Sequence, residues 1–278
     1  MAAVLPALLD DLAAETAALD AVLAPLRPPE WARPTPAAGW NIADQVSHLA
    51  YFDETALLAA VDPARFRHHA REVLAGLADL PDRVAAEHRD RAGRDLLDWF
   101  RGARQALLDG FASVDPSRRL PWYGPDMSPA SSVTARLMET WAHGQDVCDA
   151  LGTARPVTNR LRHIAHLGVR TMAFSFALNG LAVPDDPVRV ELSGPGSDRW
   201  AWGPPEAANR IRGTALDFCL AVTQRRNPAD LALDVRGGAA QEWITIAQAF
   251  AGPPGLGRPP SNAGTAPVTG PRGAGSRY

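Results

Sequence analysis

Lysine is absent from this 278-residue chain, and cysteine occurs only twice. Apart from histidine, every basic residue is therefore an arginine, and 28 arginines against 31 acidic residues give a formal net charge of −3. No basic run or aromatic-interleaved basic stripe is present, so nucleic acid is not an expected partner. The two cysteines, Cys148 and Cys219, are too few for a disulfide framework, and we expect both to be buried and reduced.

Long apolar runs are also absent. No stretch reaches the roughly eighteen consecutive apolar residues that a membrane span needs. Acidic residues interrupt any signal-peptide core near the N-terminus: Asp10, Asp11, Glu15 and Asp20. We therefore expect a cytoplasmic protein without a membrane partner. No P-loop and no GxGxxG motif is present, so the sequence gives no support for a nucleotide cofactor.

Apolar residues recur at helical spacing through the first 152 residues, which predicts a mainly α domain built as a four-helix bundle. The first helix is expected over residues 3–25, and Asn41 followed by Asp44 is typical of a helix N-terminus. Further helical patterns cover residues 66–77 and 96–111. Ser128 before Pro129 and Gly152 are expected to bracket the last helix of the domain.

The remaining residues predict a smaller α+β domain over 153–250, beginning with one bridging helix over 157–179. From Val188 the period changes to two, and a Gly-Pro-Gly-Ser turn before Trp200 predicts a β-hairpin. A helix near 214–225, a strand near 231–235 and a helix near 241–250 would complete this domain. Residues 251–278 are rich in Gly and Pro and are predicted to be a disordered tail.

Three side chains of metal-ligand type stand on the predicted helices. His48 lies on the second helix, while Glu139 and His143 lie four residues apart on the last and therefore share one face. Three protein ligands with a fourth position left open are typical of catalytic zinc. The alternatives are an ordinary packed or exposed histidine and an ordinary i,i+4 helix pair.

Four further residues are candidates for a site. Asp146, one turn past His143, is a candidate partner for an imidazole N–H or a general base, unless it is an ordinary surface carboxylate. Arg212 is a candidate for binding a carboxylated substrate, unless it simply faces solvent. The linker over 115–129 contains Trp122 and Tyr123, large side chains that a solvated loop rarely carries, so we expect it to fold over a bound cofactor or substrate.

Two segments carry a resemblance to a known family. Gly39 to Leu49 (GWNIADQVSHL) and Met138 to Asp146 (METWAHGQD) resemble the metal-binding helices of the mycothiol-dependent maleylpyruvate isomerase family, a group of DinB-like bundles. The resemblance covers residues 1–152, and the rest is similar to that family's smaller C-terminal domain of the wyosine-base-formation-like kind. It implies metal ligation by His48, Glu139 and His143. The segment over 121–128 (PWYGPDMS) also looks like a recurrent family loop.

The resemblance further implies a function. Relatives bind zinc at such a site and use its open position for a thiol or substrate, so the expectation is a zinc enzyme that uses mycothiol in isomerisation or transfer on a small molecule. A thiol-independent lyase, cyclase or hydrolase and a non-catalytic metal-stabilised binding protein remain alternatives. Two histidines and a glutamate also suit nickel, cobalt or iron. The chain is expected to be a monomer or a homodimer.

Overall fold

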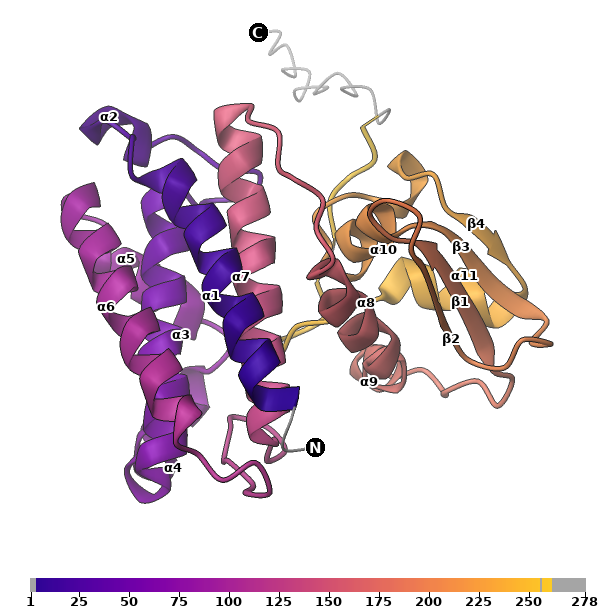
Figure 1. Ribbon diagram of the computed structural model, residues 1–278, viewed down its shortest axis with the longest axis horizontal. Helices are drawn as coiled ribbons and strands as arrows, with labels where there is room; N and C mark the ends of the chain where they lie inside the picture. Colours follow the sequence, from indigo (N-terminus) through magenta and orange to yellow (C-terminus); the bar gives the residue numbers. More distant parts are fainter. Residues whose placement is uncertain (1–3, 256, 262–278) are drawn as a thin grey trace, which may run out of the picture.

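The computed structural model describes residues 4–255 and 257–261. Four long helices lie side by side as a bundle, α1 (Val4–Leu23), α3 (Ile42–Val61), α6 (Gly93–Ala112) and α7 (Pro129–Leu151) (Figure 1). Shorter helices lie in the connections: α2 (Pro28–Trp31), α4 (Pro63–Val73), η1 (Leu74–Gly76) and α5 (Leu80–His88). The predicted class, mainly α with a small α+β part, is confirmed.

The ends of the bundle helices follow from local sequence. Asn41 and Asp44 form a reciprocal capping box, in which each side chain accepts the other's backbone N–H at 2.9 Å. Such a cap contributes about 1 kcal/mol to helix stability. At α7, the Ser128 hydroxyl accepts the Ser131 N–H, and Gly152 ends the helix with φ of 67°. These caps fix where α3 and α7, the two helices of the candidate site, begin or end.

The predicted bridging helix over 157–179 is wrong in its extent. The structure has two helices, α8 (Leu161–Arg170) and α9 (Met172–Leu178), and no helix over residues 157–160. The break lies at Thr171, whose hydroxyl donates to the carbonyls of Leu167 and Gly168. The backbone of Thr171, with φ of −93° and ψ of 8°, departs from α-helical values there.

A four-stranded sheet in the order β2-β1-β3-β4 forms the C-terminal part. The predicted hairpin is confirmed as β1 (Val188–Ser193) antiparallel to β2 (Arg199–Trp202). The sequence pattern missed β3 (Asn209–Thr214), which pairs parallel to β1, because Ile211 is the only bulky apolar residue in it. Beside β4 (Asp234–Arg236), the part contains α10 (Ala215–Val222), η2 (Pro228–Asp230) and α11 (Gly238–Ile246).

One buried apolar cluster connects the two parts of the molecule. It extends from Leu137 and Trp141 of the bundle through Leu161 and Ile164 of α8 to Phe218 under the sheet. Both cysteines are buried, as predicted. Within the described ranges no helix is long and apolar enough to span a bilayer.

The tail predicted over 251–278 is described only up to Ser261, apart from residue 256. In this stretch Arg258 pairs with Asp146 of α7, and Ser261 donates to Asp230 through its backbone N–H and its hydroxyl. The rest of the predicted tail lies outside the described residues.

Candidate metal centre

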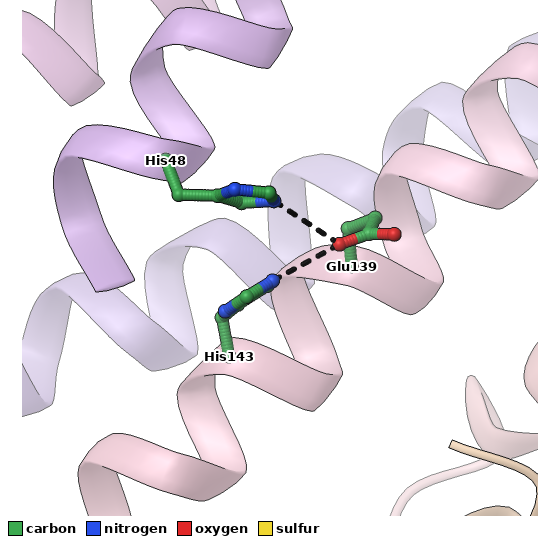
Figure 2. Close-up of side chains that lie close together, drawn as sticks. All are labelled: His48, Glu139 and His143. Atoms are coloured by element: carbon green, nitrogen blue, oxygen red, sulfur yellow. Dashed lines mark hydrogen bonds and ion pairs between the residues drawn. The ribbon is translucent and has the colours of Figure 1, made fainter. Parts of the chain in front are cut away.

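The three side chains of metal-ligand type converge from two helices (Figure 2). His48 points from α3 toward α7, where Glu139 and His143 stand one turn apart. One Glu139 carboxylate oxygen lies 3.4 Å from His48 Nε2 and 3.0 Å from His143 Nε2. Each residue offers one ligand atom, and the three atoms lie within 4.8 Å of one another. The structure therefore brings together the residues that the sequence placed ninety positions apart.

Burial sets the charge of this group. His48 and His143 are 9% and 8% exposed. Burial lowers the pKa of His143 to about 3 and lowers the pKa of His48 below its usual value, so both imidazoles are neutral at pH 7. Burial opposes ionisation of Glu139, but the neighbouring imidazoles of His143 and His48 outweigh it and hold the pKa of this carboxyl well below its usual range. The centre therefore combines two neutral imidazoles with one carboxylate.

A buried glutamine orients one of the imidazoles. Gln45, fully buried on α3, accepts the Nδ1–H of His143 with its Oε1. Its Nε2 donates to the Thr35 hydroxyl at 2.8 Å, and that hydroxyl donates to the Trp40 carbonyl at 2.9 Å. With the proton on Nδ1, a neutral His143 has a lone pair on Nε2.

The donor set fits a divalent cation. In the form protonated on Nδ1, the Nε2 lone pair of His143 faces the Glu139 oxygen at 3.0 Å, and this imidazole places no proton between the two atoms. A cation between the two atoms would relieve the repulsion between the lone pair and the carboxylate. Two nitrogens and one carboxylate oxygen are ligands that zinc and neighbouring transition metals accept.

Aromatic rings surround the centre. Trp40 and Phe52 lie 5.5 Å and 4.6 Å from the His48 ring, measured between centroids. Tyr123 lies 6.4 Å from Phe52, and its hydroxyl bonds to His69 Nε2 at 2.9 Å. Trp122 stacks on Phe66 of α4 at 5.7 Å. Trp122 and Tyr123, the two predicted cofactor-binding residues, thus belong to a cluster of aromatic rings that also contains Phe52 and Phe66.

The other two candidates lie elsewhere. Asp146 is buried and pairs with Arg225, at 3.1 Å, and with Arg258, whereas Gln45 occupies the position beside His143 Nδ1. Arg212 lies on β3, half exposed, and pairs with Glu191 of β1. The structure therefore does not bring Arg212 to the three ligand-type side chains, and Asp146 faces arginines instead of an imidazole.

Sequence reasoning missed Gln45. One signal was available, because Gln45 is a long polar residue one turn before His48 and therefore shares a face of the predicted helix with it. In a buried helix such a residue needs a hydrogen-bond partner. A helical wheel alone does not say that this partner is on α7.

Comparison with known proteins gives matches over both parts of the chain. Residues 12–148 match the family described as mycothiol maleylpyruvate isomerase N-terminal domain, and residues 184–234 match wyosine base formation. Two Mycobacterium tuberculosis proteins, Rv0036c of strain H37Rv and MT0041 of strain CDC 1551, are each 51% identical over 248 residues. These alignments cover 89% of this chain and 96% of each relative, and both relatives are described as uncharacterised.

Solved structures with the same fold are also similar. The crystal structure of a mycothiol-dependent maleylpyruvate isomerase aligns with a TM-score of 0.57 at 14% identity, and a histidine-to-alanine mutant of that enzyme aligns with 0.58 at 13%. Each alignment covers 83% of this chain and 92% of the other. At this identity the likeness concerns the fold, and it confirms the bundle with its smaller C-terminal part.

Proposed function

Because the chain belongs to the mycothiol-dependent maleylpyruvate isomerase family, we propose that it is a metal-dependent enzyme of that type. In this proposal His48, Glu139 and His143 hold one divalent cation, in the simplest case zinc. One observation carries the proposal: two buried imidazoles and a carboxylate, all of metal-ligand type, meet within 4.8 Å. A bound cation would explain why these three groups meet in a buried place.

The proposed reaction is a thiol-assisted isomerisation or transfer on a small electrophilic molecule, with mycothiol as cosubstrate. A divalent cation would supply Lewis acidity and favour the thiolate form of a bound thiol at neutral pH. The chain's own residues set the charge, orientation and solvent access of this site. Glu139 provides the negative charge, Gln45 orients His143, and the Trp40 and Phe52 rings limit the access of water to the imidazoles.

Metal analysis tests the ligand set. We expect about one equivalent of metal per chain in the purified protein, measured by inductively coupled plasma mass spectrometry, and loss of the metal in His48→Ala and in Glu139→Ala. His68→Ala is the matched control, because His68 and Glu72 form a histidine and glutamate pair four residues apart that is exposed on α4. A wild type that neither contains metal nor takes up zinc, nickel or iron would refute the proposal.

Addition of the thiol separates the proposed reaction from its alternatives. A ligand that binds only the folded protein raises the melting temperature, so saturating mycothiol should stabilise the metal-loaded wild type and leave Glu139→Ala unchanged. Without any stabilisation of a metal-loaded protein, a thiol-independent lyase, cyclase or hydrolase would replace the thiol-dependent function. A metal-loaded protein that is stabilised by neither thiol nor any electrophile, and that turns none over, would instead be a metal-stabilised binding protein.

A further inference from the structure

The structure places the carboxamide of Gln45 with its Oε1 toward His143 and its Nε2 toward Thr35. The Thr35 hydroxyl has a single proton, which it donates to the Trp40 carbonyl at 2.9 Å. In this arrangement the hydroxyl accepts from Gln45, whose Nε2 lies 2.8 Å away. The Gln45 Oε1 consequently points toward His143 Nδ1, and because a carbonyl oxygen only accepts, His143 must donate there.

We propose that Gln45 is a positioning residue that fixes His143 in the tautomer protonated on Nδ1 and so directs the Nε2 lone pair toward Glu139 and His48. A neutral imidazole carries one proton, so placing it on Nδ1 leaves Nε2 free as a ligand atom. In known metal sites, loss of a buried hydrogen-bond partner of a ligand residue lowers the metal affinity about 10-fold to 100-fold. The effect on affinity rests on the proposed function, whereas the tautomer does not.

The two imidazoles differ in how they are held. His48 Nδ1 is buried and has no hydrogen-bond partner among the described residues, so the His48 ring is oriented by packing against Trp40 and Phe52. Only His143 is oriented by a hydrogen-bond chain. The Trp40 indole N–H donates to Asp82 at 2.7 Å, so this chain is also anchored on α5. Gln45 therefore links the centre to the loop and helix that cover it.

The tautomer is measurable without any metal. In the metal-free protein at pH 7.5, labelled with ¹⁵N, long-range ¹H–¹⁵N correlation distinguishes a protonated Nδ1 from a protonated Nε2. We expect His143 to be protonated on Nδ1 in wild type and in Gln45→Glu, which keeps an acceptor oxygen, and to become a mixture in Gln45→Leu. Gln145→Leu is the matched control, because Gln145 lies two residues from His143 but bonds to Asp149. A wild-type His143 protonated on Nε2 would overturn the inference.

Zinc affinity, measured by competition with a chelator, gives the second readout. Gln45→Leu should bind zinc about 10-fold to 100-fold more weakly than wild type, and Gln45→Glu should retain most of the affinity. If Gln45→Leu does not fold, Thr35→Val removes the hydroxyl that orients the amide and should give the same mixture of tautomers. A wild type that binds no metal would refute the proposed function but not the tautomer. Equal affinity in wild type and Gln45→Leu would refute the role of Gln45 in metal binding.

Discussion

Burial distinguishes two histidine and glutamate pairs that are alike in the sequence. His68 and Glu72 stand four residues apart, as Glu139 and His143 do, and they too lie within 3.2 Å. Their side chains, however, are 69% and 62% exposed, and no third ligand-type residue joins them among the described residues. Spacing on one helix does not distinguish the two pairs. Glu139 and His143 form a candidate metal centre because His48, from another helix, lies beside them.

The lowered pKa values of the two imidazoles predict how metal binding depends on pH. For an exposed imidazole with a pKa near 6.5, the neutral fraction, which has a lone pair free for a metal, falls about tenfold between pH 7.5 and 5.5. Because burial holds the pKa of His143 at about 3, protons should not compete at that imidazole, and the lowered pKa of His48 keeps its loss below the tenfold of an exposed imidazole. We expect the affinity for zinc to change less than about tenfold over this range.

Chelator competition at pH 7.5, 6.5 and 5.5 measures this, with His68→Ala as the control for the exposed histidines. A loss of about 100-fold by pH 5.5 would show two imidazoles of ordinary pKa and would contradict the prediction. The stability of the fold should depend on pH in the same direction and decrease as the pH falls. In the unfolded chain both imidazoles regain a pKa near 6.5, so the stability that the neutral imidazoles contribute is complete above pH 6.5. It is lost as the pH falls toward about 3.

At the scale of helices, a buried ionic network joins α3, α6 and α7 close to the candidate centre. Asp53 of α3 accepts from Arg104 of α6 and from Arg136 of α7, each at 2.8 Å. Arg104 also donates to Thr140 of α7 at 2.9 Å. Arg136 precedes Glu139 by three residues, so the network fixes α7 against α3 one turn from the ligand-type side chains. Two guanidinium groups share one carboxylate there, and all three groups are buried.

Removing the shared charge should destabilise the bundle. Asp53→Asn would leave two buried guanidinium groups without a counter-charge, and breaking such a buried pair costs about 3–5 kcal/mol. Urea unfolding followed by circular dichroism measures this. Asp20→Asn is the matched control, because Asp20 pairs with Arg101 of α6 at the surface, where the loss is below about 1 kcal/mol. Equal stability of the two variants would contradict the role of Asp53.

Helix ends were more predictable than contacts between helices. Asn41, Ser128 and Gly152 mark helix ends because their caps depend on residues three or four positions away. The break at Thr171 and the strand β3 were missed, since both depend on a choice between backbone bonds that the apolar pattern does not record. Likewise, the partners of Asp53 and Gln45 come from other helices. Sequence periodicity shows that such polar residues occur in a helix, but not what they contact.

At the scale of the whole molecule, carboxylates of α7 hold the C-terminal part against the bundle. Asp149 pairs with Arg226 through two hydrogen bonds of 2.7 Å and 2.6 Å. Asp146 is fully buried and pairs with Arg225 and with Arg258. Arg225 and Arg226 come from the segment after α10 and Arg258 from a later segment that follows α11, so residues far apart in sequence meet on one helix. Asp146 is therefore placed to act as an anchor between the two parts.

The variant Asp146→Asn separates an anchoring role from the role in the site that the sequence suggested. As an anchor, Asp146 balances two largely buried guanidinium groups, and its replacement should lower the free energy of unfolding by about 3–5 kcal/mol while the metal content stays at one equivalent. Urea unfolding and metal analysis of the same preparation measure both quantities. Asp234→Asn, which affects an exposed pair with Arg236, should change neither by a measurable amount. If Asp146→Asn instead loses metal at unchanged stability, Asp146 supports the imidazoles of the centre, and its ion pairs with the arginines contribute little to the free energy of unfolding.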